Sequence, residues 1–175
     1  MRKVSILFGL LLMAFIVSCA PSIYVNHDFD AGYNFTNLKT YNWLPIVASA
    51  QVSELKIKRM QNAVDKELQS KGMKLSSENP DFLIAVQGMA QTKVNVTDWG
   101  YSYGPRWGMG TRNVDVTTYK EGTVFLDFVD GKTKELFWRG GATSVVEPDL
   151  SAEGQEQKFA LAASKLLAEF PPTAK

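Results

Sequence analysis

The sequence predicts an α+β domain, a two-layer sandwich in which a mainly antiparallel sheet carries two helices packed on one face. Three observations predict this fold. Several short segments alternate apolar and polar residues, as strands do when one face of a sheet is covered. Two longer segments repeat apolar residues every three or four positions, which is the period of a helix with one buried face. The segments follow one another as strand, strand, helix, long strand, hairpin strands and helix.

Two strands and a helix are predicted in the first part of the domain. Ile23 to Phe29 alternates weakly, and Thr40 to Trp43 has the aromatic and β-branched composition that strands favour. Ser53 is a good N-cap for a helix, and Gly72 suits the left-handed residue that ends one. A single apolar stripe with helical spacing runs between them, at Ile57, Met60, Val64 and Leu68.

A long strand and a hairpin follow this helix. The apolar residues of the long strand share one face if no bulge intervenes, and they are Phe82, Ile84, Val86, Val94 and Val96. The dipeptide Asp130-Gly131 signals the hairpin turn. The other face of the long strand is polar at several positions, so we expect a sheet that is covered on one side only.

The hairpin register follows from the same pattern. Pairing Phe128 with Leu136 and Leu126 with Trp138 puts the large apolar side chains on one face, whereas a slip of one residue mixes them with charged residues. After the hairpin, Ser151 is a suitable cap for the last helix. The apolar stripe of that helix consists of Phe159, Ala163, Leu166, Leu167 and Phe170, and Pro171-Pro172 ends it.

Composition excludes several classes of function. The 175 residues are 45% hydrophobic and 21% charged, which suits one folded domain and argues against disorder. One cysteine cannot form an internal disulfide, and one cysteine with one histidine cannot form a zinc site of those residues. The formal net charge of +1 argues against a strongly basic nucleic-acid binder. Because phosphate-loop, nucleophile-elbow and calcium-loop motifs are also absent from the sequence, we expect no cofactor, no metal and no enzymatic activity.

The first residues have the pattern of a bacterial secretory signal. Arg2 and Lys3 precede an uncharged run from Val4 to Val17, which is too short to span a membrane comfortably. The run ends in Ile16-Val17-Ser18-Cys19, which resembles the lipobox of bacterial lipoproteins. We therefore predict a signal peptide at residues 1–18, a lipid-anchored tether at 19–22 and a single domain at 23–172. The alternatives are an ordinary cleaved signal with a chance cysteine, or an uncleaved anchor.

The lipobox resemblance implies a lipid anchor on Cys19. It implies a diacylglyceryl thioether on the sulfur and an acyl group on the new amino terminus, and two or more chains give stable membrane attachment. Ala20 stands where an aspartate would resemble an inner-membrane retention signal, which favours the outer membrane, facing the periplasm. Removal of residues 1–18 would leave 157 residues with 17 basic and 18 acidic side chains, a formal charge of −1.

Six short phrases lie at residues 38–43, 79–84, 119–124, 126–130, 136–140 and 170–172. Together they resemble a lipoprotein family, the domain of unknown function 4136. The resemblance runs over nearly all of the predicted mature chain. It implies a lipid-anchored bacterial envelope domain with no assigned activity, and it carries no catalytic residues over to this chain.

The segment from Thr97 to Asn113 is the candidate contact surface. It combines glycines with four aromatic residues, and the first three share one face of an extended strand because they are spaced by two. Aromatic side chains on a glycine-rich loop can contact a protein partner, a sugar or a lipid headgroup. The alternative is a hairpin tip whose aromatic side chains fold back onto the sheet. The candidate residues are Trp99, Tyr101, Tyr103 and Trp107.

Other chemistry-bearing residues are interpreted as structural. His27 is the only histidine and has no obvious orienting group on its own face of the strand. Asp127 is expected diagonally near Arg139, and such an ion pair would contribute less than about 1 kcal/mol if exposed. Glu121 precedes a glycine, which is consistent with a bulge or with entry into a strand.

The leading hypothesis is a lipid-anchored envelope protein with a non-catalytic domain that has a structural or protein-interaction role. The second is an envelope module that binds a small ligand or glycan through the aromatic segment 97–113. The last is a hydrolase that uses Asp127 and Glu121. A binding module needs an apolar pocket, an adaptor needs an exposed apolar patch, and a hydrolase needs two carboxylates about 5–10 Å apart.

Overall fold

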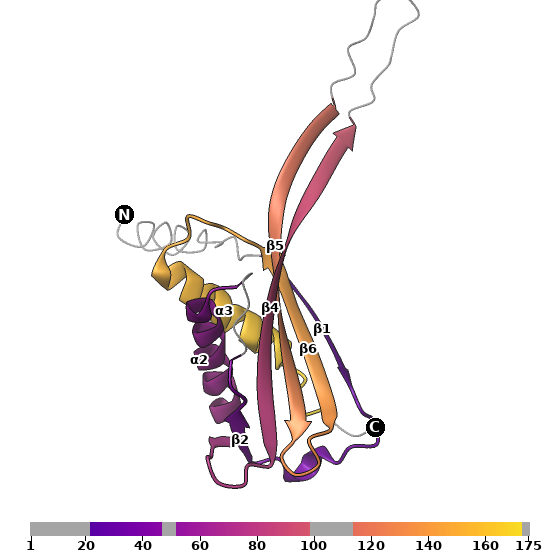
Figure 1. The fold of residues 1–175 in the computed structure, drawn as a ribbon, viewed down its shortest axis with the longest axis vertical. Helices are drawn as coiled ribbons and strands as arrows, with labels where there is room; N and C mark the ends of the chain where they lie inside the picture. Colours follow the sequence, from indigo (N-terminus) through magenta and orange to yellow (C-terminus); the bar gives the residue numbers. More distant parts are fainter. Residues whose placement is uncertain (1–21, 47–51, 99–113, 173–175) are drawn as a thin grey trace, which may run out of the picture.

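The computed structural model describes residues 22–46, 52–98 and 114–172, and in these ranges the chain forms a two-layer α+β sandwich (Figure 1). A mixed six-stranded sheet is one layer. The helices α2 (Glu54–Ser70) and α3 (Ala152–Leu166) lie side by side on one face of it. The predicted fold class is therefore confirmed.

The sheet is mainly antiparallel. Its strands lie in the order β1-β6-β5-β4-β2-β3, and only β2 runs parallel to its neighbours, β3 and β4. The two-residue strand β3 and a short 3-10 helix η2 (Phe35–Asn37) were not predicted, because neither is long enough to show a periodic pattern. The strand bounds are β1 Ile23–Phe29, β2 Thr40–Trp43, β3 Lys74–Leu75, β4 Phe82–Asp98, β5 Val114–Asp130 and β6 Leu136–Val145.

Both helices begin at the predicted caps. The Ser53 hydroxyl accepts a hydrogen bond from the Leu55 amide at 3.3 Å, and the Ser151 hydroxyl accepts one from Gly154 at 3.1 Å. Gly72 has φ +85°, a left-handed conformation that favours glycine just beyond a helix end. The whole predicted stripe of α2 is buried, at Ile57, Met60, Val64 and Leu68.

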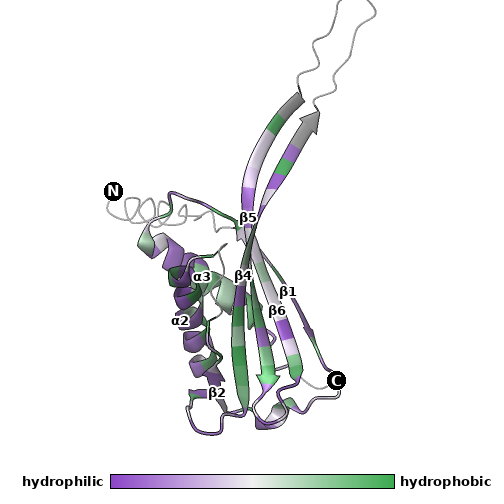
Figure 2. Ribbon diagram, in the orientation of Figure 1, coloured by the Kyte–Doolittle hydropathy of each residue, from purple (hydrophilic) through white to green (hydrophobic). Residues whose placement is uncertain are grey.

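A cluster of aromatic side chains forms the centre of the core. The Phe128 ring lies 4.7 Å from both Trp138 and Phe170 and 5.2 Å from Phe82, measured between centroids. All four side chains are 2% exposed or less, and each such pair contributes about 0.5–1.5 kcal/mol beyond burial alone. Figure 2 shows that apolar residues follow β4 and β5 where the helices cover the sheet.

The predicted hairpin register is wrong. Phe128 pairs with Trp138 rather than Leu136, and an irregularity between Phe128 and Val129 shifts the register. This bulge allows two consecutive residues, Phe137 and Trp138, to be buried, while Leu136 is 47% exposed. A strictly alternating pattern buries only every second residue, so it could not anticipate that arrangement.

The true register also places Asp127 directly opposite Arg139 rather than diagonal to it. The guanidinium donates two hydrogen bonds to the carboxylate, at 2.5 and 2.6 Å. Asp127 is only 7% exposed, so this bidentate pair is stronger than the exposed pair expected from the sequence. The hydrogen bonds and negative charge of Asp127 raise the pKa of Arg139.

The hairpin of β4 and β5 continues beyond the rest of the sheet (Figure 1). Pairing of β5 with β6 ends at Glu121 and Val145, whereas β4 and β5 remain paired to Asp98 and Val114. Because β4 runs without a bulge, Val94 lies on the same face as Ile84 and Val86, as predicted. It is nevertheless 59% exposed, because no helix covers this part of the strand.

Asp81 and Asp130 tie together the connections at the opposite end of the sheet. One oxygen of Asp81 accepts hydrogen bonds from the Lys39 amide, the Thr40 amide and the Thr40 hydroxyl, at 2.8–2.9 Å. Asp130 accepts the Thr133 amide at 2.8 Å and the Tyr33 hydroxyl at 2.8 Å. These bonds lower the pKa of Asp130, and they lower the pKa of Asp81 although partial burial opposes them.

Gly131→Ala is expected to lower the free energy of unfolding by about 2–4 kcal/mol. The Gly131 amide donates to the Asp81 carbonyl at 2.8 Å, and an added Cβ would overlap the carbonyl oxygen of Pro80. Chemical denaturation measures the effect. Gly32→Ala is the control, because its added Cβ would meet only the Asp30 carboxylate, at 3.3 Å. If Gly131→Ala lowers the free energy of unfolding no more than Gly32→Ala does, the predicted clash is contradicted.

Asp81→Asn is expected to cost about 1 kcal/mol of unfolding free energy at pH 7, after allowance for the exposure of this residue. A carboxylate whose pKa is lowered by folding stabilises the fold above its unfolded pKa of about 3.9, and this contribution is lost as pH falls through the lower folded value. Denaturation from about pH 5 to about pH 2 should therefore show the two proteins converging. A difference that is constant over that range would argue against the charged hydrogen bonds.

Candidate functional site

A cavity of about 300 Å³ lies between the two helices and the sheet, where the β4–β5 hairpin begins to leave the sheet. Ile57 and Met60 of α2 and Phe159 of α3 form its helical walls, and Val124 and Ala142 lie on the sheet side. Phe159 belongs to the predicted stripe of α3 but is only half-buried, because its side chain borders the cavity.

The cavity results from a decrease in side-chain size along three neighbouring strands. Ile84, Phe128 and Trp138 are paired across β4, β5 and β6 and fill the space beneath the helices. Four residues further along each strand, the corresponding row is Gly88, Val124 and Ala142. The next row on the same face is Ala90, Gly122 and Ser144. Since protein interiors are close-packed, small side chains on one layer leave open space unless the other layer moves in.

Two glycines allow loop residues to close the sides of this space. A Cβ on Gly88 would lie 2.8 Å from a methyl carbon of Val52, and one on Gly122 would lie 3.2 Å from a methyl carbon of Val146. Both valines line the cavity, one just before α2 and the other just after β6. The glycines therefore set how closely these walls approach the sheet.

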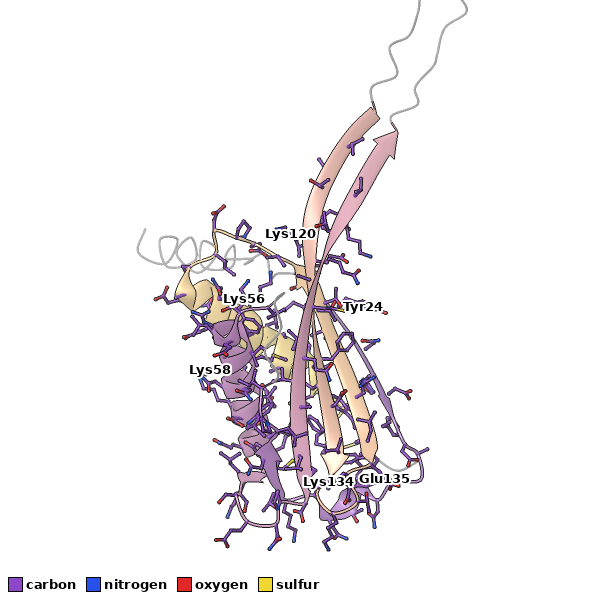
Figure 3. The ribbon with its side chains drawn as sticks, viewed as in Figure 1. Tyr24, Lys56, Lys58, Lys120, Lys134 and Glu135 are labelled. Atoms are coloured by element: carbon purple, nitrogen blue, oxygen red, sulfur yellow. The ribbon has the colours of Figure 1, made fainter. Side chains whose placement is uncertain are left out.

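Three lysines from three different elements line the mouth. Lys158 of α3 donates to the Val145 carbonyl at 2.6 Å and lies 2.8 Å from a carboxylate oxygen of Glu147. Among the described residues, neither Lys56 of α2 nor Lys120 of β5 has a carboxylate within 4.0 Å of its amine. Figure 3 shows Lys56 and Lys120 at the same end of the domain.

Sequence reasoning missed this site. The signal was the replacement of large residues by Gly88 and Ala90 on the apolar face of β4, and by Gly122 on β5. It becomes interpretable only when the register shows that these positions are neighbours. Single lysines such as Lys56 carry no signal of their own, because most exposed helices have them.

The predicted site residues fall outside the described part of the chain. Cys19, the proposed lipidation site, precedes its first residue, and Trp99, Tyr101, Tyr103 and Trp107 lie in the gap between β4 and β5. Their predicted roles therefore stay predictions.

His27 lies on the edge strand β1 in a structural setting. Its ring stacks between Phe29 and Trp138, at centroid distances of 6.4 and 6.2 Å, and its Nε2 lies 3.5 Å from a carboxylate oxygen of Glu169. No other histidine exists in the sequence, and the described residues hold no cluster of three or more metal-ligating side chains.

The two carboxylates of the hydrolase hypothesis are not brought together. Asp127 forms the bidentate pair with Arg139, and Glu121 lies 3.8 Å from the amine of Lys93. Six residues of one strand separate the two acids, which corresponds to about 20 Å. Two-carboxylate hydrolysis needs a separation of at most about 10 Å, so this geometry does not favour it.

Within the described ranges, α2 and α3 are both too short or too polar to cross a membrane. No curated protein matches this chain in sequence.

Solved structures share the fold at low identity. A PDZ domain protein from Parabacteroides distasonis matches with a TM-score of 0.56 and 15% identity; the match covers 95% of this chain and 40% of that one, so this chain spans less than half of its length. The PelC dodecamer from Paraburkholderia phytofirmans matches with a TM-score of 0.50 and 12% identity, over 84% of this chain and 96% of that one. At these identities the likeness shows the fold alone.

The family comparison is more specific. The family described as "Domain of unknown function (DUF4136)" matches residues 25–172, which include nearly all of the described sheet and both helices. The match agrees with the resemblance carried by the six sequence phrases. This chain therefore belongs to the DUF4136 family.

Proposed function

We propose that this chain is a lipid-anchored cell-envelope protein whose non-catalytic domain binds a small apolar or amphipathic ligand in the cavity beneath its helices. The cavity itself carries the proposal. Its size is at the lower end of ligand sites, and its walls are mainly apolar with charged groups at the mouth, as such sites usually are.

The distribution of exposed apolar residues also favours a ligand over a flat protein interface. An adaptor surface needs a contiguous apolar patch. Outside the hairpin of β4 and β5, the exposed large apolar side chains among the described residues are instead spread over several elements, including Tyr24 on β1, Leu55 on α2, Leu75 on β3 and Leu136 on β6. Four others lie on that hairpin, which is the surface of the second candidate function below: Met89, Val94, Val116 and Tyr119.

The anchor and the cavity lie close together along the chain. Ile23 lines the cavity and is the first residue of β1. Three residues lie between it and Cys19, and the four steps along the chain span at most about 14 Å. A lipid on Cys19 would therefore hold the cavity near the membrane surface, which suits a ligand drawn from or delivered to that membrane. The outer membrane, facing the periplasm, is the proposed location.

The projecting hairpin supports a second candidate function. From Thr92 to Asp98, β4 extends away from the helices together with β5, over about 20 Å. This hairpin leads into the aromatic segment 97–113, which could contact another envelope protein or a glycan. Serine replacement of Trp99, Tyr101, Tyr103 and Trp107 tests it, since an unchanged set of partners in envelope pull-downs would count against this function.

Cys19→Ala is expected to abolish lipidation and to release the protein from the membrane fraction, because no other residue can accept the thioether. Mass spectrometry of the mature amino terminus and fractionation of envelopes measure the two effects. A variant that is still fully processed and membrane-bound would overturn the anchor.

Val124→Phe is expected to fill the cavity and to reduce ligand binding by about tenfold or more. The probe is decanol with a photoactivatable diazirine near its methyl end, added to membranes that contain the full-length protein. In the unmodified protein, mass spectrometry should find the label on peptides that line the cavity, and in Val124→Phe the label on these peptides should fall. Because the variant fills space rather than empties it, its stability should not fall by more than about 1 kcal/mol.

Val129→Phe is the matched control. It makes the same change on the same strand, but residues at odd positions of β5 point to the face away from the helices. Labelling should therefore persist in Val129→Phe. Equal labelling of cavity peptides in a folded Val124→Phe protein would contradict the proposed function.

A further inference from the structure

We infer that the ligand of this cavity is an acyl chain with an anionic head group, and that Lys56 and Lys120 hold the head group at the mouth. This inference rests on the proposed function of the cavity and names the chemistry of its ligand.

The walls of the cavity are mainly apolar, although Thr123, Ser144 and Gln155 also belong to its lining. Its deep walls are the side chains of Ile57, Met60, Phe159, Val124 and Ala142, none of which can donate or accept a strong hydrogen bond. A polar ligand placed against these apolar walls would lose most of its hydrogen bonds to water, which disfavours sugars and peptides. An unbranched alkyl chain has no such loss.

The mouth of the cavity keeps a net positive charge even though one of its lysines is paired with a carboxylate. Glu147 is the one acidic residue among the described residues that line the cavity, and it already pairs with Lys158 at 2.8 Å. Lys158 is also fixed by its hydrogen bond to the Val145 carbonyl at 2.6 Å. Lys56 and Lys120 remain to receive a negative charge, and an ammonium group is a strong partner for carboxylate or phosphate oxygens.

This charge is local rather than a reflection of a basic protein. The formal net charge of the whole chain is only +1. The two lysines come from α2 and from β5, which lie on opposite layers of the sandwich, so the fold rather than the sequence brings them to one opening. Ser53, the N-cap of α2, also lines the mouth, so the positive end of that helix dipole adds to the same field.

An apolar interior with a cationic rim matches the two ends of an acyl amphiphile. The anchor proposed at Cys19 would hold this opening near a membrane, where such molecules are concentrated. Carboxylate and phosphate head groups are both anionic, and two lysines by themselves do not discriminate between them.

The test compares three photoactivatable probes that differ only in the head group: decanoate, decanol and decylamine. Each is added to membranes that contain the full-length protein, and labelled cavity peptides are quantified. Decanoate should label these peptides at least about tenfold more strongly than decylamine, because the lysines attract one head and repel the other. Equal labelling by decanoate and decylamine would overturn the inference.

The variant pair Lys56→Glu with Lys120→Glu should reduce decanoate labelling by about tenfold and increase decylamine labelling. The matched control is Lys58→Glu with Lys134→Glu, which makes the same change in net charge at exposed lysines that do not line the cavity (Figure 3). The control should label as the unmodified protein does. Unchanged decanoate labelling in the mouth variant would contradict the assignment of these lysines.

Two features keep the outcomes separable. The double variant Lys56→Gln with Lys120→Gln removes both positive charges without adding negative ones. It is used in place of the double glutamate variant if circular dichroism shows that the latter is misfolded. Decanoate labelling of the double glutamine variant should fall several-fold. Failure of all three probes to label cavity peptides would refute the proposed function itself. Strong decanol labelling without a preference for decanoate would refute only the head-group inference.

Discussion

The structure depends on the aromatic packing at one end of the sandwich. Phe128 contacts Phe82, Trp138 and Phe170, with centroid distances of 4.7–5.2 Å, and these side chains fill the space between the layers. Because rings of this size cannot be compressed, they fix how far the helices stand from the sheet. The same separation continues to the row of Gly88, where the side chains are too small to fill it. The cavity is therefore a consequence of the core and not a local defect.

The end of the sheet that holds the aromatic cluster is also where the loops are tied most firmly. Asp81 accepts three hydrogen bonds from the segment that begins β2, and Asp130 accepts a bond from Tyr33, far away in sequence. The Tyr33 ring in turn stacks on Phe137 at 4.1 Å. This network leaves the opposite end of the sandwich as the part bordered by loops and by the lysine-lined mouth. The hydrogen-bonded loops and the proposed binding cavity thus lie at opposite ends of the strands.

Periodicity was sufficient to predict the layers, because burial of one face leaves a repeating signal in each strand and helix. The caps at Ser53 and Ser151 were predictable for the same local reason. The register of the hairpin was not predictable, because the bulge after Phe128 accompanies the packing of Phe137 against Tyr33 and Phe82, which are distant in sequence. The cavity was harder still to predict, since Gly88, Gly122 and Ala142 acquire meaning only once three strands are aligned.

An apolar cavity that opens to water is a cost that the fold carries when no ligand is present. The side chain of Phe159, which borders the cavity and is only half-buried, has fewer packing partners there than it would in a filled core. A ligand that binds the folded state and not the unfolded chain would recover those contacts, and it would stabilise the domain in proportion to its concentration and affinity. Selection for stability alone favours larger side chains at such positions, since cavity-filling substitutions commonly stabilise proteins. The presence of glycine or alanine in two successive rows is therefore consistent with the proposed binding role of this space.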